Sequence, residues 1–370
     1  MGKTNADVLV VGAGPAGIAT AIAASLKGLK VSVADLRKPP IDKPCGEGLL
    51  PGGVSALRTL GIHLTPRLAF PLTGIRFVDD HSSASAMLPR GAAFGLRRTV
   101  LHQLLVDRAM QLGVSFLWGA RVSELHPSGA RVDGSLFRCK WIVGADGQNS
   151  LVRKWARLGP VRPSHSRFGF CRHFSISPWA SFVEVYWGER CQAFVTPVGH
   201  DQVCVAILSN DSRLRIGNAL AFFPEIAERV RGAQPSSSEL GTVTMLSKAR
   251  RVTGKNVALV GDASFCVDGI AGQGMSLAFQ QAAQLGEALA RNDLSYYAAA
   301  HRRITKMPAR ITRLLLEMGR RAWLRRKVIR LFAGNPGLFS QVISIHTGGI
   351  PPEVLKVREA FGLGWQVLRA

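Results

Sequence analysis

The chain has 370 residues, 47% hydrophobic and 19% charged, which is ordinary for a globular protein and long enough for one large domain or two interlocked ones. Its formal net charge of +23 predicts attraction to a phosphate-rich cofactor, an anionic membrane surface or nucleic acid. Nucleic acid is the least expected of these because no known reader motif accompanies the charge. The six cysteines form no C-x-x-C pair, so we expect no metal, no disulfide framework and a reducing, cytoplasmic location.

The first expected element is a βαβ unit over residues 6–35 that carries a dinucleotide-binding pattern. A β-branched run predicts a buried parallel strand, and the glycines at 12, 14 and 17 follow it directly. Gly12, Gly14 and Gly17 fit a tight turn, a close approach of the backbone to a pyrophosphate, and close packing of the next helix. That helix offers free N–H groups to the phosphates. Asp35 ends the second strand, where its carboxylate can accept a hydrogen bond from a ribose hydroxyl.

The same segment resembles a targeting sequence. From Val8 to Leu26 there is no charge, and Lys3 precedes this stretch, as in a signal peptide or a membrane span. The glycine spacing and the packing of a helix on a strand explain the apolarity better. We therefore reject the targeting interpretation, and no other segment is apolar enough to span a bilayer.

The following elements are a loop, short strands and a helix. Residues 36–53 are rich in Pro and Gly and predict a loop, which is followed by a short helix ending near Gly61. Short strands with turn residues are expected over 70–97. A helix is expected from about Thr99 to Leu112 because its apolar positions recur at helical spacing. Strands then lead to the sequence WIVGADG.

The second half of the chain begins with a different pattern. Alternating segments between about 166 and 250 predict an antiparallel sheet with one covered face. The sequence NVALVGDA predicts another buried strand, and a helix is expected from Met275 to Ala290. From residue 295 onward the chain is expected to be helical and is rich in arginine.

These elements predict an α/β fold in which a Rossmann-type domain carries an inserted antiparallel or mixed-sheet substrate domain and C-terminal helices. The expected boundaries are 1–70, 98–160 and 250–295 for a discontinuous nucleotide-binding domain, 71–97 and 161–249 for the sheet domain, and 296–370 for a basic helical C-terminal region. Ligands usually bind in crevices at such domain junctions.

Three further signals join the glycine pattern. Asp146 lies in a GADG sequence after a strand, Gly261 and Asp262 end a strand before a glycine-rich loop, and Arg98 opens a helix. Alone, each is typical of a turn, a helix cap or a surface charge. In this order, the chain resembles the flavoprotein monooxygenase superfamily typified by para-hydroxybenzoate hydroxylase, which includes geranylgeranyl reductases and flavin-dependent halogenases. The resemblance covers roughly the first 290 residues.

This resemblance implies FAD as the bound cofactor. Its ADP half would lie on the first glycines and Asp35, Arg98 would contact the pyrophosphate or ribityl chain, and Asp262 would accept a ribityl hydroxyl. The start of the helix after the glycine-rich loop would lie beside the pyrimidine edge of the flavin. The implied cofactor-binding residues are Gly12, Gly14, Pro15, Ala16, Gly17, Asp35, Arg98, Asp146, Gly261, Asp262, Gly272, Gln273, Gly274 and Met275. NADPH or NADH would be a transient reductant, since the chain has no second G-x-G-x-x-G.

The chain also departs from the hydroxylase pattern. Aromatic hydroxylases usually carry a His and a Pro-Pro pair in the loop where this chain has Phe265 and Asp268-Gly269. The sequence CGEGLLP, from Cys45 to Pro51, is more similar to the reductase and halogenase branches. The Trp-x-Trp-x-Ile-Pro signature of tryptophan-type halogenases is absent.

The resemblance therefore leaves the reaction open. The first expectation is an NAD(P)H-dependent FAD monooxygenase that hydroxylates or epoxidises a lipophilic or aromatic molecule through a flavin C4a-hydroperoxide. The alternative is an FADH₂-dependent reductase of double bonds in an isoprenoid or similar lipid, as in geranylgeranyl reductases. A third interpretation is a non-enzymatic module that binds membranes or nucleic acid through its cationic tail.

A few side chains are candidates near the chemistry. Cys45 and Glu47 are candidate catalytic residues, because Glu47 could orient substrate or move a proton; alternatively, Glu47 caps a helix and Cys45 packs as a small hydrophobe. Trp187 is expected to fill the core of the sheet rather than line a pocket. His173, His200 and His301 show no partner spacing, and we expect no site role for them.

The tail has two interpretations. Residues 302–330 contain eleven basic residues and one acid, Glu317. Apolar residues recur at 304, 307, 311, 314, 315 and 318. Such a basic amphipathic helix suits an anionic membrane surface, but the same periodicity fits a helix packed on its own domain.

Overall fold

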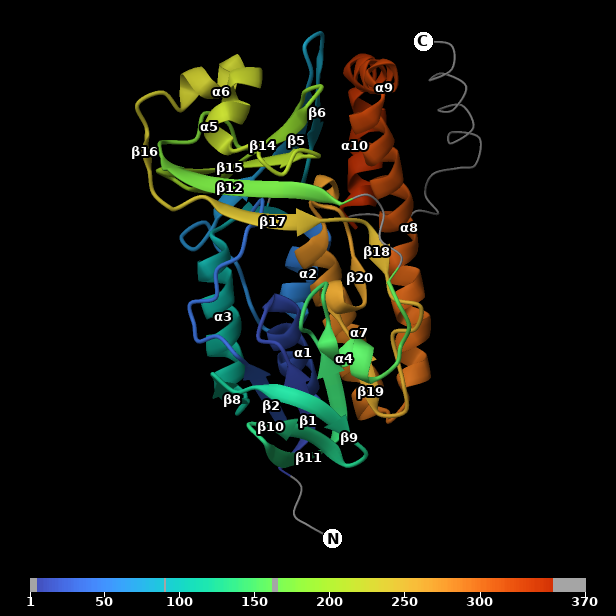
Figure 1. Ribbon diagram of the computed structural model, residues 1–370. Helices are drawn as coiled ribbons and strands as arrows, with labels where there is room; N and C mark the ends of the chain where they lie inside the picture. Colours follow the sequence, from blue (N-terminus) through green and yellow to red (C-terminus); the bar gives the residue numbers. More distant parts are fainter. Residues whose placement is uncertain (1–4, 90, 162–165, 349–370) are drawn as a thin grey trace.

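The structure is a computed structural model that describes residues 5–89, 91–161 and 166–348 (Figure 1). The end of the predicted C-terminal region, residues 349–370, therefore lies outside the described residues. Two large sheets form the framework, and long helices run along one side of both. The predicted α/β fold with a Rossmann-type domain, a mixed sheet and C-terminal helices is confirmed.

The first sheet contains the predicted dinucleotide-binding strands. Its parallel strands are β8 (Ser115–Trp118), β2 (Val31–Asp35), β1 (Ala6–Val11), β11 (Ser135–Gly144) and β19 (Val257–Leu259). A hairpin of β9 (Val122–His126) and β10 (Gly129–Val132) extends β11 in antiparallel fashion. Strands β1, β2 and β19 are almost fully buried, as expected when helices cover both faces, whereas β8 at the edge of the sheet is exposed or half-buried throughout.

Three helices pack around this sheet: α1 (Pro15–Ser25), α3 (Arg98–Gln111) and α7 (Gly274–Ala290). Helices α1 and α7 approach closely because Gly286 lacks a side chain: a Cβ there would lie 2.7 Å from the Cβ of Ala23. The two predicted helices, Thr99–Leu112 and Met275–Ala290, each begin one residue earlier than expected.

The second sheet is mixed. Its order is β16 (Gln234–Pro235), β12 (Arg167–Ser175), β15 (Gln202–Ser209), β14 (Cys191–Gly199), β13 (Phe182–Trp187), β5 (Gly74–Val78) and β6 (Ser83–Met87), and β17 (Leu240–Thr244) also pairs with β12. All these pairs are antiparallel except β5 with β13. The parallel pair joins strands more than 100 residues apart in sequence, which local alternation cannot reveal.

Short elements connect the two sheets. The predicted 36–53 loop is shorter than expected, because β3 (Gly48–Leu49) and the first turn of α2 (Pro51–Thr59) lie within it. Strand β3 pairs with β7 (Ala93–Gly95), which also pairs with β4 (Phe70–Leu72). The remaining short elements are α4 (Leu151–Trp155), α5 (Ile216–Ala219), α6 (Pro224–Arg229), β18 (Ser247–Lys248), β20 (Phe265–Cys266) and three 3₁₀ turns, at Leu220–Phe222, Gly261–Ala263 and Gly269–Ala271.

Three further helices form the C-terminal region: α8 (Leu294–Arg320), α9 (Ala322–Gly334) and α10 (Pro336–His346). Figure 1 shows α8 running past both sheets along one side of the molecule. The helices share a core cluster with the second sheet through Leu315, Met318, Val328, Ile329, Phe332, Phe339 and Ile343. Most of the apolar face of the tail is therefore covered by the protein itself. None of the helices in the described part of the chain combines the length and apolarity that crossing a membrane requires.

Candidate active site

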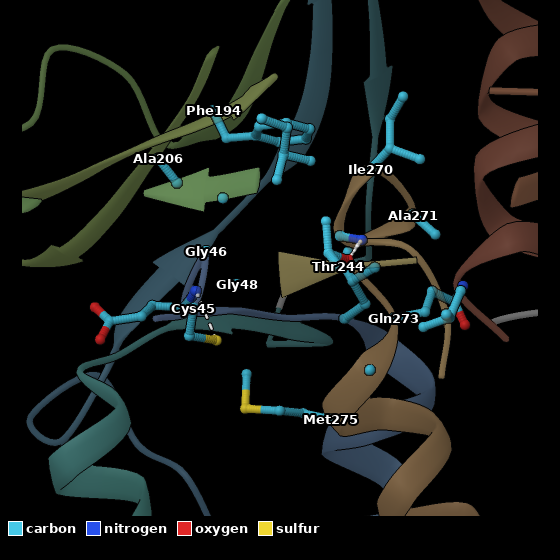
Figure 2. A pocket seen from close by; sticks show the side chains of 18 of the residues that line it. Cys45, Gly46, Gly48, Phe194, Ala206, Thr244, Ile270, Ala271, Gln273 and Met275 are labelled. Carbon is cyan, nitrogen blue, oxygen red and sulfur yellow. Dashed lines mark hydrogen bonds between the residues drawn. The ribbon is translucent and has the colours of Figure 1, made fainter. Parts of the chain in front are cut away.

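A cavity of about 430 Å³ lies where the two sheets and the C-terminal helices meet. One wall consists of the glycine-rich turns at the carboxyl ends of the first sheet, a second wall is a face of the second sheet, and α8 to α10 provide the third. Figure 2 shows this arrangement: Cys45, Phe194, Ile270 and Met275 surround one open space from four different elements.

The first glycine turn is built for close approach. Gly12 has a φ of +107°, and a Cβ there would strike the Ala145 carbonyl, whereas a Cβ on Gly17 would strike the Gly12 carbonyl. At Gly14 a Cβ would meet no atom within 4 Å, and the N-terminus of α1 carries no side-chain cap. The turn therefore leaves space and free N–H groups where an anionic group can bind.

Asp35 fixes this turn from the neighbouring strand. Its Oδ2 accepts from the Ala13 N–H at 2.8 Å, and its Oδ1 accepts from the Arg37 N–H at 2.8 Å. A buried His102 ring nitrogen lies 2.9 Å from the Ala13 carbonyl on the other side. The turn is thus held from two elements, and the half-buried carboxylate retains lone pairs for a hydroxyl donor.

Two opposite charges line the cavity near the turn. Arg98, the first residue of α3, lines the cavity, and its Nε is buried without a partner among the described residues. The Asp262 side chain is open to the cavity, and desolvation by the surrounding cavity walls raises its pKa, while Arg98 and Lys43 oppose the shift. Arg98 can therefore bind an anionic or hydrogen-bond-accepting group of a ligand, and Asp262 can bind a hydrogen-bond donor.

The second glycine loop presents a helix N-terminus to the cavity. Gly272 has a φ of +61°, and neither Gly272 nor Gly274 would place a Cβ within 4 Å of another atom. Helix α7 begins at Gly274, and the Gln273 side chain does not cap it. The Nε2 of Gln273 is buried without a partner among the described residues. This wall therefore favours a ligand that carries negative charge and hydrogen-bond acceptors.

Asp146 lies directly behind the cavity lining, at the start of α4. Its Oδ2 accepts from the N–H groups of Leu151 at 2.7 Å and Val152 at 3.1 Å, so it caps α4. The neighbouring Gly147 and Gln148 line the cavity. In the structure, Asp146 therefore supports the segment that lines this wall. Its direct contact with a cofactor stays a prediction.

Glu47 is buried at the junction of the two sheets. Its φ of +57° is unusual for a residue with a side chain. Its Oε1 accepts from the Arg98 N–H at 2.8 Å, so Glu47 does cap a helix, α3, as one sequence interpretation held. Its Oε2 lies 2.6 Å from Nε2 of His173 on β12, and Nδ1 of His173 lies 2.8 Å from the Ser237 hydroxyl. His173 thus has a partner that its sequence spacing does not reveal.

A group of cysteines adjoins this pair. One ligand atom each from Glu47, His173 and Cys204 lies within 4.8 Å of the others. The Cys171 and Cys204 thiols hydrogen-bond to each other, and the Cys204 thiol also points to the Cys45 carbonyl at 3.6 Å. Sequence reasoning missed this cluster because its members come from three separate segments. Cys45 itself lines the cavity, and enclosure by protein raises the pKa of its thiol.

The rest of the cavity is mostly apolar, with Thr196, Thr242, Thr244 and His346 as polar exceptions. The second sheet contributes Ile75, Phe77, Val183, Val185, Phe194 and Leu208, and the helices contribute Ile311, Leu314, Leu315, Met318, Val328, Phe332, Phe339 and Ile343. Trp187 packs edge-on against Phe77 with ring centroids 5.5 Å apart, and only 1% of it is exposed. The prediction that Trp187 belongs to the core is confirmed.

Together these walls fit FAD. The open glycines, the uncapped helix ends and the unpartnered Arg98 and Gln273 nitrogens provide what a pyrophosphate and a flavin edge require. The structure brings Gly14, Pro15, Ala16, Cys45, Glu47, Arg98, Gly261, Asp262, Gly272, Gln273, Gly274 and Met275 to one cavity. Gly12 and Gly17 pack against protein, and Asp35 supports the turn. This site defines a flavin-dependent oxidoreductase.

Comparison with known proteins identifies the family. Residues 5–293 match the FAD binding domain family, and the chain belongs to it. Menaquinone reductase of Mycobacterium tuberculosis is 28% identical over 326 residues, covering 79% of this chain and 78% of that protein. Digeranylgeranylglycerophospholipid reductase 1 of Methanothermobacter thermautotrophicus is 28% identical over 297 residues, covering 74% of each chain.

A solved structure supports the fold. A triple mutant of the flavin-dependent brominase Bmp2 superposes with a TM-score of 0.76 at 18% identity, over 98% of this chain and 100% of that one. The predicted resemblance to the flavoprotein superfamily and the prediction of an FAD-dependent enzyme are confirmed. The named relatives include reductases and, over 41% of this chain, a 3-(3-hydroxy-phenyl)propionate/3-hydroxycinnamic acid hydroxylase of Mycobacterium sp., so the reaction requires a separate argument.

Proposed function

We propose that the protein reduces carbon–carbon double bonds in an isoprenoid or similarly unsaturated lipid. The observation that carries this proposal is the shape of the site: an apolar cavity, walled by aliphatic and aromatic side chains, ends at the glycine loops that fit a flavin. Two relatives bear the names of reductases of isoprenoid lipids, menaquinone and a digeranylgeranyl glycerophospholipid. The missing Pro-Pro pair and the CGEGLLP segment, both noted in the sequence, favour the same reaction.

Different parts of the site would bind the cofactor and the substrate. Reduced FAD, held by the glycine turns and the N-terminus of α7, would supply a hydride for one alkene carbon, and NADPH or NADH would supply the electrons that reduce FAD. The N-terminus of α7 offsets negative charge at the flavin edge. In this proposal the apolar walls hold the alkene and exclude water. Phe194 and Ala206, on neighbouring strands of the second sheet, line the cavity on that side (Figure 2).

The second alkene carbon needs a proton. Cys45 lies on the cavity wall, and the raised pKa of its thiol keeps the sulfur protonated near neutral pH. Its Sγ is oriented by the Glu47 N–H at 3.3 Å (Figure 2). In this proposal Cys45 gives up its proton as the C–H bond forms, and solvent returns the proton after product release.

The test compares oxygen-free and aerobic turnover. The FAD-loaded protein is mixed with NADPH or NADH and menaquinone or a geranylgeranyl lipid, and the product is analysed by mass spectrometry. The proposal expects a product that gains two hydrogen atoms without oxygen, with slower turnover in Cys45→Ala than in Cys45→Ser. A product that gains one oxygen atom, formed only in air, would establish the monooxygenase reaction that sequence analysis placed first and would overturn the proposal.

A further inference from the structure

The outer face of α8 and α9 is strongly basic. Eight of the eleven basic residues between 302 and 330 are exposed: Arg302, Arg303, Lys306, Arg310, Arg313, Arg320, Arg321 and Arg330. Glu317 pairs with Arg320 and Arg321. Within the described ranges, the first five of the eight form no ion pair with a carboxylate. This face therefore keeps most of its positive charge uncompensated by the protein.

Two large apolar side chains are exposed among these basic residues. Leu314 on α8 is 49% exposed, and Trp323 at the start of α9 is 54% exposed. Other apolar residues of the same helices, such as Leu315 and Met318, are buried in the protein. Exposed Trp and Leu beside arginines are typical of surfaces that bind the interface of a bilayer.

The active-site cavity opens next to this face. Leu314 lines the cavity while being half exposed, and so does Val243 of β17, which is 36% exposed. Because both residues belong to the cavity lining and to the surface, we infer that the apolar cavity reaches the surface beside β17 and α8. One side of this opening is therefore also the basic face.

A second cleft lies beside α8. It is lined by Lys248 and Arg250 from the β18 segment and by Arg313 of α8, over an apolar floor that includes Phe265 and Ala309. No acidic side chain is among its described lining residues. Three cations around one cleft fit a phosphate group.

We propose that this face docks the protein on a bilayer of anionic phospholipids. The arginines of α8 and α9 contact the lipid phosphates, the second cleft holds one headgroup, and Leu314 and Trp323 enter the interface. The cavity mouth then faces the bilayer, and a lipid substrate passes into the site without crossing water. The docking is argued only from the charge and exposure of this face, whereas the delivery of substrate rests on the proposed function.

Vesicle flotation tests the docking. Full-length FAD-loaded protein is mixed with vesicles of phosphatidylcholine, with or without phosphatidylglycerol, at low and high salt. The proposal expects binding only to vesicles with phosphatidylglycerol, and loss of binding at high salt. Quenching of tryptophan emission by brominated phosphatidylglycerol is expected to fall in Trp323→Phe.

Two variants of equal charge locate the surface. The first replaces four residues of the face by glutamine: Arg303, Lys306, Arg310 and Arg313. The matched control replaces four exposed residues elsewhere: Lys30, Lys154, Arg213 and Lys255. The first variant is expected to lower vesicle partitioning about 100-fold or more and the control only slightly. Bound FAD absorbance shows that both are folded.

Several outcomes would overturn the docking. These are absent binding to anionic vesicles, equal binding to neutral ones, equal losses in both variants, or duplex DNA that displaces the vesicles at equal phosphate concentration. Delivery is tested by turnover: the first variant should lose activity on substrate in vesicles and keep it in detergent micelles. If even the wild type turns over no lipid, the proposed function fails, while the flotation result still decides the docking.

Discussion

The Glu47 carboxylate and the His173 imidazole meet at 2.6 Å, although 126 residues separate them in sequence. Each is only 2% exposed. Glu47 also receives the N–H of Arg98, so one carboxylate connects the loop beside the cavity, the start of α3 and the second sheet. A residue with a φ of +57° persists only where the surrounding contacts hold it. We interpret the pair as a clamp that keeps the flavin side and the substrate side of the site in register.

Replacing Glu47 by alanine removes this clamp. The His173 ring and the Arg98 N–H lose a buried acceptor, so we expect the free energy of unfolding to fall by about 2–5 kcal/mol. Urea unfolding of the FAD-loaded protein measures the change. Glu124→Ala is the control, because Glu124 pairs with Arg131 on the surface and such pairs contribute about 0–1 kcal/mol. Equal stability of the two variants would refute the clamp.

Alanine substitutions at Gly14 and Gly17 are expected to affect different properties: FAD binding at Gly14 and the stability of the apoprotein at Gly17. Gly14→Ala adds a methyl group to open space, so the apoprotein should unfold like the wild type, but FAD should bind at least about tenfold more weakly because the methyl blocks the pyrophosphate. Gly17→Ala drives a methyl group into the Gly12 carbonyl, so it should destabilise the apoprotein itself by about 1–3 kcal/mol. Titration with FAD and urea unfolding distinguish the two. A Gly14→Ala protein that binds FAD normally would contradict the assignment of this turn.

The contrast between this turn and the Glu47 clamp shows what sequence can predict. Gly12, Gly14, Gly17 and Asp35 lie within one βαβ unit, and their roles follow from local spacing, so the pattern predicted both the turn and the cofactor class. The partner of Glu47 depends on how β12 is placed in the second sheet, and no local pattern encodes that placement.

The tail shows a second limit. Its 3.6-residue periodicity predicted an amphipathic helix correctly, but periodicity is the same whether the apolar face meets a membrane or a sheet. The structure shows that most of this face packs on the protein; among the large apolar side chains of residues 294–348, Leu314 and Trp323 are the exposed ones. The place of Leu314 in the cavity lining could not be predicted, because it depends on how α8 packs on the second sheet.

The buried His301 predicts a loss of stability in acid. Burial lowers its pKa from 6.5 to about 3, with a smaller contribution from Lys248. Between these two pH values the unfolded chain binds a proton that the folded chain does not, so stability decreases as the pH falls. From pH 7 to pH 5 the expected contribution is about 2 kcal/mol.

The measurement is the difference between wild type and His301→Gln in urea unfolding at the two pH values. Glutamine does not titrate, and its amide can replace the 3.0 Å contact to the Ser264 hydroxyl. The subtraction removes the background of His102 and His346, whose pKa values are also lowered by burial. Parallel pH profiles for the two proteins would show that His301 is already able to protonate in the folded state.

A substitution at Ala206 tests the substrate side of the cavity, formed by the second sheet, without changing the residues that bind FAD. It pairs with Phe194 across β15 and β14 and faces the cavity opposite Met275 (Figure 2). Ala206→Phe places a ring in the space assigned to the alkene chain, so kcat/KM for a long isoprenoid should fall at least about tenfold, with Ala206→Val in between. FAD affinity should not change, because the flavin turns lie on the other wall. A loss of FAD in step with the loss of activity would instead place the cofactor against the second sheet, and the division of the cavity into a flavin end and a lipid end would then be wrong.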